Sequence, residues 1–261
     1  MFIRVDSRPL VLHAASRSRQ IPNSSMSIAE NIAHVRSRIA AAAARVKRGP
    51  DSITLMAVSK TVEPERIREA YAAGLRVFGE NRVQEFAEKA PLLAGLKDAR
   101  WHLIGHLQSN KARKAAELFA AVDSVDSLRL AEKLNQAAEQ AGKTLPVLIE
   151  IKVGGEETKH GIPLDSPELE NLLRGAAKLE HLQVRGLMTV PPYTEDPEGA
   201  RNYFRCLRDL RDQIAARKLP HIQMDVLSMG MSHDFEVAIE EGSTCVRVGS
   251  AIFGERPKPP A

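Results

Sequence analysis

A lysine ends an apolar, branched run of strand length in the stretch ITLMAVSKT, residues 53–61. Glu63 and Pro64 follow and open a predicted helix, so the run predicts a buried strand with the Lys60 amine at its carboxyl end. In α/β folds, ligands and catalytic groups collect at that edge of the sheet. A lysine that is partly desolvated there loses basicity and becomes a usable nucleophile. Taken alone, Lys60 fits a solvated strand cap better, because most lysines that end strands are solvated.

Further polar side chains follow other predicted strands at the same edge. Each could be an ordinary cap or turn residue, and Asn81 and Ser109 suit the role of helix N-caps. Their joint placement favours a site. The groups are Glu80 and Asn81 after the second strand; His106, Gln108, Ser109 and Asn110 after the third; Met188 and Thr189 after the sixth; Ser228, Gly230 and Ser232 after the seventh; and Arg247, Gly249 and Ser250 after the eighth.

Two glycine-containing stretches, LSMGMSHDF and VRVGSAIFG, have the composition of a phosphate site. The first puts small residues and hydroxyls before a predicted helix at 234–241, whose free amides and dipole favour an anion. Barrel enzymes frequently bind phosphate with the loops after strands seven and eight. The alternative is that these glycines merely turn the chain. Together with Lys60, the two loops supply what pyridoxal phosphate requires, an amine for its aldehyde and a cup for its phosphate.

The histidines and cysteines give weaker chemical signals. His102 and His106 flank the end of the third strand in HLIGH, but the sequence shows neither a metal-ligand context nor a partnering acid, so we expect no metal site. His160 in KHG and His233 in SHD fall in loops, where they could contact a ligand or nothing. No Cys–His pairing or GxSxG elbow supports nucleophilic hydrolysis.

Eight strand–helix steps place these groups along the chain. Alternating strands and helices specify a parallel sheet, and eight such units in about 235 residues match a (β/α)8 barrel, here with an extra helix from Ile28 before the first strand. An open doubly wound sheet is the alternative, and the absence of a dinucleotide-type glycine fingerprint disfavours it. We expect the last helix to be missing or reduced, and strands at Ile53–Val58, Leu75–Phe78, Trp101–Ile104, Phe119–Val122, Val147–Val153, Val184–Met188, Met224–Leu227 and Cys245–Val248.

Composition excludes several classes of protein. The 261 residues are 43% hydrophobic and 27% charged, which suits one large domain or two small ones, and no apolar run is long enough to span a membrane, so we expect a soluble protein. The net charge of +4 comes mainly from residues 1–25, where four arginines face one acid. The balanced remainder and the aromatic content of 4% disfavour nucleic acid binding. Cys206 and Cys245 lie in periodic apolar segments and are interpreted as buried free thiols of a reducing compartment.

The two ends of the chain differ in character from the rest. Residues 1–25 are rich in Arg and Ser, which resembles an organelle transit peptide, although an upstream start codon with Met26 as the true beginning is equally plausible. We therefore expect a disordered or transit-like tail over residues 1–25, a barrel domain over residues 26–256 and a frayed tail over residues 257–261. A cytoplasmic location is expected, with organelle targeting left open, and the missing secretory core disfavours export.

Six motifs, AVSKT, FGENRVQE, WHLIGHLQSNK, GLMTV, LSMGMSHDF and VRVGSAIFG, occur in an order that resembles the pyridoxal-phosphate homeostasis protein family, whose members are relatives of the amino-terminal barrel of alanine racemase. The resemblance runs from about Ile28 to Phe253. It implies a single-domain barrel that binds pyridoxal 5′-phosphate as an imine on Lys60 and maintains vitamin B6 and amino-acid balance, with no established catalytic residue. The residues that it implies around the cofactor are Asn81, Met188, Ser228, Gly230, Arg247, Gly249 and Ser250.

The same residues favour cofactor binding over turnover. Arg247 is similar to the racemase arginine near the pyridine nitrogen, although the sequence leaves open whether its tip reaches ring or phosphate, and an arginine beside that nitrogen weakens the electron sink. The resembling racemases also take a second base from a tyrosine of a carboxyl-terminal domain, which we do not expect here. We expect a monomer with pyridoxal-phosphate-dependent apo-enzymes as candidate partners. The alternatives are an amino-acid racemase or other imine-forming lysine enzyme with His106, Tyr193 or a ligand water as second base, and a structural protein without ligand.

Overall fold

Eight parallel strands form a closed barrel in the computed structural model, which describes residues 26–155 and 160–255. Neighbouring strands follow the order β1, β2, β3, β4, β5, β7, β8 and β9, and the pairings of β9 with β1 and of β4 with β5 close the ring. The (β/α)8 prediction is confirmed, and the open-sheet alternative is wrong. The strands are β1 Thr54–Val58, β2 Val77–Glu80, β3 Arg100–Leu103, β4 Ala121–Val125, β5 Leu145–Lys152, a short β6 Ile162–Pro163 paired to β5, β7 Leu182–Met188, β8 Ile222–Met231 and β9 Cys245–Val248.

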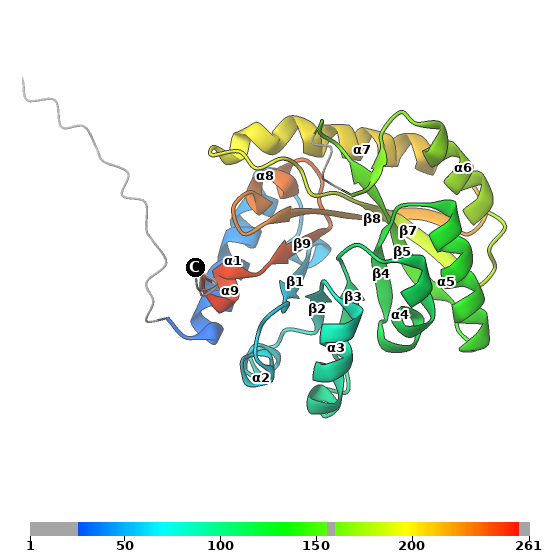
Figure 1. Cartoon of the computed structure of the whole chain (residues 1–261). Coiled ribbons are helices and arrows are strands. Elements are labelled where there is room, and N and C mark those ends of the chain that lie inside the picture. The colour runs from blue at the N-terminus through cyan, green and yellow to red at the C-terminus, as the bar shows by residue number, and fades with distance from the viewer. Residues whose placement is uncertain (1–25, 156–159, 256–261) are drawn as a thin grey trace, which may run out of the picture.

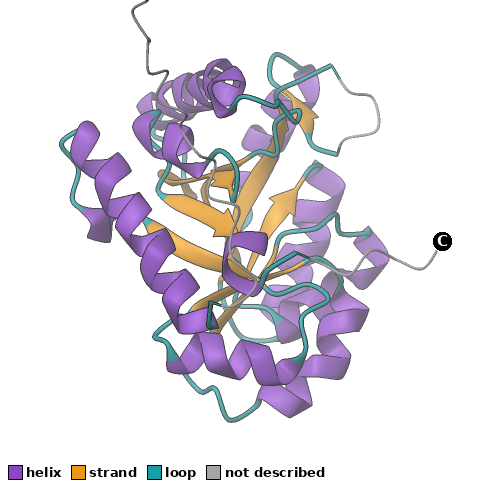
Figure 2. Ribbon diagram, turned by 90° about the vertical axis from the view of Figure 1, so that its left-hand side faces the viewer, coloured by secondary structure: helices purple, strands orange, loops and turns teal. Residues whose placement is uncertain are grey.

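Helices surround the strands (Figures 1 and 2) and begin where the sequence supplies caps. At the first helix the Ser27 hydroxyl accepts from the Glu30 amide at 3.2 Å, while the Glu30 carboxylate accepts from the Ser27 amide at 2.8 Å. The hydroxyls of Ser127 and Ser166 cap two later helices by accepting from the Leu130 and Leu169 amides. The α-helices are α1 Ile28–Arg45, α2 Pro64–Ala72, α3 Val83–Lys89, α4 Ala112–Leu118, α5 Leu128–Gln140, α6 Pro167–Ala176, α7 Arg201–Ala216, α8 Phe235–Glu240 and α9 Ser250–Phe253.

Helix α1 covers the side of the barrel that the short last helix leaves open. Helix α9 has only four residues, and α1 packs against both α8 and α9. Its apolar face buries Ile32, Val35 and Ile39 at spacings that keep one side of a helix inward. The Asn31 side-chain amide donates to the Ile252 carbonyl at 3.0 Å. The predicted extra helix is therefore an integral part of the barrel wall.

Buried polar side chains gather near the carboxyl ends of the strands. The rest of the core is apolar, and its two large clusters lie between the strands and the outer helices. Burying polar groups costs free energy unless they are paired, so their concentration at one end marks that end for a site. They include Ser59, Glu80, Asp123, Ser124, Glu150, Thr189, Ser228 and Arg247.

Three strands end later than the sequence predicts. Strand β2 ends at Glu80 instead of Phe78, β4 occupies Ala121–Val125 instead of Phe119–Val122, and β8 continues to Met231 instead of ending at Leu227. All three extensions contain polar residues that are completely or almost completely buried, namely Glu80, Asp123 and Ser228. Polar residues at the end of an apolar run look like the start of a loop, which is why the sequence placed these boundaries too early.

The cysteines are free thiols, as predicted, but only one of them is buried. Cys245 lies inside the barrel, whereas Cys206 is exposed because α7 buries Phe204, Leu207 and Ile214 and turns position 206 outwards. None of the helices in the two described ranges combines the length and apolar character that crossing a bilayer requires. The predictions for residues 1–25 and 257–261 concern segments outside the described residues.

Candidate functional site

Lys60 lies just beyond the end of β1 and is half-buried. The residue after it, Thr61, has a φ of 58°, in the left-handed region that a β-branched side chain rarely adopts. The Thr61 amide donates to the Glu85 carboxylate of α3 at 2.6 Å, which holds this turn. An uncommon backbone conformation fixed by a charge-assisted hydrogen bond is typical of a functional position. The turn therefore constrains the backbone that carries the lysine.

The residue before Lys60 is anchored as firmly. Ser59 is completely buried, and its hydroxyl donates to the Glu80 carboxylate at 2.7 Å. Lys89 of α3 donates to the Ser59 carbonyl at 3.0 Å and to Glu85 at 2.6 Å. Burial raises the pKa of Glu80, while the Ser59 hydrogen bond and the Lys89 charge act against that rise. This network holds both peptide neighbours of Lys60 against β2 and α3.

Arg247 lies on the strand next to the one that carries the lysine. It lies on β9 in register with Met56 of β1, and it is only 4% exposed. Its guanidinium donates to the Ser228 hydroxyl and to the Thr189 carbonyl, both at 2.7 Å. Burial lowers the pKa of Arg247, and the nearby Glu150 is among the acidic groups that oppose this shift. The arginine thus joins the ends of β7, β8 and β9, and Met188, one residue before Thr189, is completely buried beside this junction.

Backbone amides after β9 form a candidate anion cradle. The amides of Gly249 and Ala251 both donate to the Ser232 hydroxyl, at 3.3 and 3.4 Å. Gly249 is half-buried and Ser250 is exposed, so a ligand can reach this loop from solvent. A phosphate oxygen is a stronger acceptor than a hydroxyl and suits two converging amides. The donors present here fit a phosphate group.

The first glycine stretch lies in a strand instead of a loop, and its contact with a phosphate stays a prediction. Because β8 runs to Met231, the residues at 228–231 belong to a strand, and α8 that follows has only six residues. The Asp234 carboxylate accepts from the Met231 amide at 2.6 Å, so the last amide of β8 is already paired. Gly230 has a φ of 94°, and an added Cβ would lie 2.6 Å from Ala238, so glycine lets α8 approach the strand. The Gly249 and Ala251 amides after β9 are further candidate donors to a phosphate.

Asn81 follows β2 and lies half-buried on the same rim. A Cβ on Gly105 would come within 2.3 Å of the Asn81 carbonyl oxygen, so the glycine allows the loops after β2 and β3 to touch. Asn81 borders a hollow of about 440 Å³ together with His106 and Lys111. Neither this hollow nor a groove between α6 and α7 includes Lys60 or Arg247 in its lining. Lys60 and Arg247 instead share the rim formed by the paired strands β1 and β9.

The structure brings the predicted site residues onto five contiguous strands. In the order of the ring these strands are β7, β8, β9, β1 and β2. Met188 lies on β7, Ser228 and Gly230 lie on β8, and Arg247 lies on β9, which Gly249 and Ser250 follow. Lys60 follows β1, and Asn81 follows β2. An added Cβ on Gly249 would contact Val58 at 3.5 Å, which joins the cradle loop to the strand of the lysine. An amine, an anion cradle and a buried guanidinium thus share one mouth, a combination suited to a phosphorylated aldehyde.

Several residues that support the site were not predicted from the sequence. Ser59, Glu85 and Lys89 were not recognised, although the spacing of Glu85 and Lys89 is that of a helical ion pair. The expectation that HLIGH lacks a partnering acid is wrong, because His102 Nδ1 lies 3.1 Å from Asp123 and His106 Nδ1 lies 3.1 Å from Asp126. Burial opposes protonation of His102, but the Asp123 carboxylate outweighs it and raises the pKa of that imidazole.

Comparison with known proteins identifies the family. The model of the alanine racemase N-terminal domain matches residues 27–257. The pyridoxal phosphate homeostasis protein of Aquifex aeolicus is 47% identical over 234 residues, which cover 88% of this chain and 99% of that protein. The chain belongs to the pyridoxal phosphate homeostasis protein family. The resemblance seen in the six motifs is thereby confirmed.

Solved structures agree with this assignment. PipY of Synechococcus elongatus is 39% identical, and the match covers 87% of this chain and all of PipY. Its structure without PLP gives a TM-score of 0.79 and its structure with PLP bound gives 0.77. The alanine racemase of Corynebacterium glutamicum is 20% identical with a TM-score of 0.66, and at that identity the likeness shows a common fold alone.

Proposed function

We propose that the protein binds pyridoxal 5′-phosphate on Lys60 and maintains the cellular supply of this cofactor without catalytic turnover. The observation that carries the proposal is the placement of Lys60 and the Gly249–Ala251 amides at the ends of the paired strands β1 and β9. The name of the Aquifex relative and the PLP bound to PipY support it. This placement of an amine and two amide donors supports the function expected from the sequence, which is binding of the cofactor for its homeostasis.

The residues around the mouth have distinct tasks in this proposal. The cofactor supplies an aldehyde that condenses reversibly with an amine and a phosphate that anchors it. Lys60 supplies the amine, and the anchors on Ser59 and Thr61 keep its backbone from moving with the loop. The Gly249 and Ala251 amides hold the phosphate in place of the Ser232 hydroxyl.

Arg247 serves as a fixed cation in the floor of the mouth. Its guanidinium is held by Ser228 and Thr189, so it stays charged and immobile beneath the ligand. A charged group that cannot accept a proton disfavours protonation of a neighbouring pyridine nitrogen, which carbanion chemistry would need. This arrangement favours storage and release over transformation.

Two of the three tyrosines lie on outer helices, away from the mouth, and the third lies on the rim. Tyr71 donates a hydrogen bond to Asp98 on the outside of the barrel, and Tyr203 lies in α7. Tyr193 is 77% exposed, and its ring lies 5.4 Å from that of His233 on the rim. This pair is the observation that favours the alternative, a racemase-type activity with Tyr193 as second base. Lys60-dependent exchange of solvent deuterium into the Cα position of an amino acid would support that alternative.

Borohydride reduction followed by peptide mass spectrometry tests the binding proposal. Reduction converts the reversible imine into a stable secondary amine, so the wild-type protein should carry a pyridoxyl adduct on the peptide that contains Lys60. Lys60→Ala should lose the adduct completely. Lys111→Ala, which removes another lysine of the same rim, should keep it. An adduct on a different lysine, or none at saturating cofactor, would contradict the proposal.

Three further expectations belong to the same proposal. Apo-enzymes that depend on pyridoxal phosphate are the candidate recipients of the cofactor, the protein is a monomer, and it acts in the cytoplasm. Two free thiols are compatible with a reducing compartment. Sedimentation of the purified chain with and without cofactor tests the monomer, and faster activation of an apo-enzyme by the loaded protein than by an equal amount of free cofactor tests direct delivery.

A further inference from the structure

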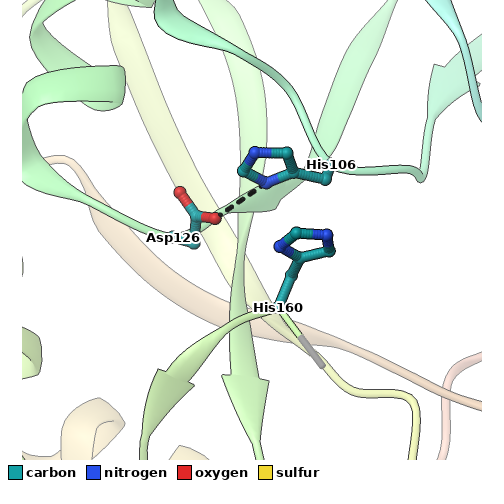
Figure 3. Close-up of side chains that lie close together, drawn as sticks. All are labelled: His106, Asp126 and His160. Atoms are coloured by element: carbon teal, nitrogen blue, oxygen red, sulfur yellow. Dashed lines mark hydrogen bonds and ion pairs between the residues drawn. The ribbon is translucent and has the colours of Figure 1, made fainter. Parts of the chain in front are cut away.

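Three side chains with metal-ligand atoms meet on the barrel rim outside the site described above. Figure 3 shows that His106, Asp126 and His160 converge there. His106 follows β3, Asp126 follows β4, and His160 lies between β5 and β6. These three barrel strands are contiguous and complete the ring that the five strands of the cofactor site begin. The cluster is therefore a separate feature of the same mouth.

The geometry of the cluster is close to that of a coordination sphere. His106 Nδ1 lies 3.1 Å from Asp126 Oδ2, and one ligand atom from each of the three residues lies within 4.8 Å of the others. Ligands about 2.1 Å from a tetrahedral zinc ion lie roughly 3.4 Å apart. The first pair already meets this spacing. Both imidazoles are exposed, so small rotations of their side chains can bring the third ligand atom to the same spacing.

The two imidazole rings of the cluster lie against each other. They stack with centroids 4.0 Å apart and an angle of 9° between the planes. A hydrogen bond from His106 to Asp126 accounts for one pair, but it does not account for the third residue.

A buried carboxylate beside the cluster provides an independent observation. Glu150 of β5 is 8% exposed, and its Oε2 atom has no hydrogen-bond partner, the only such buried side-chain atom among the described residues. Glu150 is close enough to Asp126 and to Arg247 to interact with both of their charges. A metal ion held at Asp126, or a water bound to that ion, would give the Oε2 atom a polar partner.

We propose that His106, Asp126 and His160 form a three-ligand site for a divalent transition metal of the zinc class, with its open coordination positions at the barrel mouth. Two imidazoles and one carboxylate suit zinc, cobalt, nickel or iron, whereas magnesium and calcium prefer oxygen ligands. The site does not depend on the cofactor proposal, since none of its ligands belongs to the cofactor site.

Titration of untagged apo-protein with Co²⁺ tests this site through the visible ligand-field bands of the bound ion, and calorimetry with Zn²⁺ supplies the affinity. The wild-type protein should bind one equivalent. His160→Ala and the isosteric Asp126→Asn should each weaken binding at least about tenfold. Lys60→Ala should bind the metal normally, so this test is independent of failure at the cofactor site.

His233→Ala is the matched control, because it removes another exposed histidine of the rim. His233 contacts the Thr194 carbonyl and is not one of the three residues of the cluster. It should bind Co²⁺ like the wild type. Circular dichroism of each variant confirms that the fold is kept. Equal affinity of wild type and His160→Ala, or a calcium affinity that equals the zinc affinity, would overturn the proposal.

Discussion

Replacing Glu150 with Gln should remove a pH-dependent loss of unfolding free energy. Glu150 is 8% exposed, and burial first, then the Asp126 charge, raises its pKa from 4.5 to about 7, while Arg247 acts in the opposite direction. Below pH 4.5 the carboxyl group is neutral in both the folded and the unfolded protein. As the pH rises, the unfolded chain loses this proton before the folded chain does, so ionisation favours unfolding.

The size of the effect follows from the difference between the two pKa values. A shift of about 2.5 pH units corresponds to about 3 kcal/mol of unfolding free energy. The destabilisation should be absent near pH 4.5, grow with rising pH and be complete above pH 7. The glutamine variant keeps the shape of the side chain but cannot ionise. Its stability relative to the wild type should therefore increase by about 3 kcal/mol between pH 4.5 and pH 8.

Urea unfolding of the apo-protein at several pH values measures this difference, with EDTA present to exclude metal ions. The change in relative stability with pH is the readout, because the substitution itself can shift both curves by a constant amount. Glu132→Gln on the exposed face of α5 is the control and should leave the pH profile unchanged. Parallel profiles for the wild type and Glu150→Gln would refute the reasoning, since they would mean that Glu150 has the same pKa in both states.

Two other predictions concern the thiols and the glycines. Burial raises the pKa of the Cys245 thiol to about 12, whereas Cys206 is exposed. A thiol reagent at pH 8 should therefore modify only Cys206 in the folded protein and both cysteines in urea. Rapid reaction of both thiols in the folded protein would contradict the burial of Cys245. Gly230→Ala should lower the unfolding free energy by about 2 kcal/mol or more, because φ is 94° and the new Cβ would clash with Ala238 and Phe235. Gly249→Ala is the control and should change stability little, since the nearest contact of its Cβ would be 3.5 Å. Equal effects of the two substitutions in urea unfolding would show that the close approach of α8 is not the reason for Gly230.

The sequence predicts the barrel because its signal is repeated along the whole chain. Each apolar strand followed by an amphipathic helix supports the same parallel arrangement, so an error at one boundary does not change the fold. The boundaries themselves fail where the barrel buries polar residues, as at Asp123 of β4 and Ser228 of β8. Local patterning treats such residues as solvent-exposed and cannot foresee their partners inside the mouth.

The candidate site was predictable in part, because the ends of parallel strands lie at one end of the barrel. Lys60 follows the apolar run of β1 by two positions and Arg247 lies one position before the end of β9, and parallel strands bring those ends together. Their supporting partners are separated in sequence, as Ser59 is from Glu80 by 21 positions. The stacking of His160 on His106 depends on how two distant loops fold over the rim, and no local pattern encodes it. The roles assigned to the individual site residues stay predictions until the adduct is mapped.

The packing of α1 on α9 has a consequence for the order of folding during synthesis. The hydrogen bond from Asn31 to Ile252 spans 221 positions, and β1 pairs with β9 across a similar separation. Helix α1 can pack against α2 early, but its contacts with α8 and α9 can form only after most of the barrel has been synthesised. We expect closure of the barrel to be a late, post-translational event, because contacts so distant in sequence form only after the intervening chain is in place.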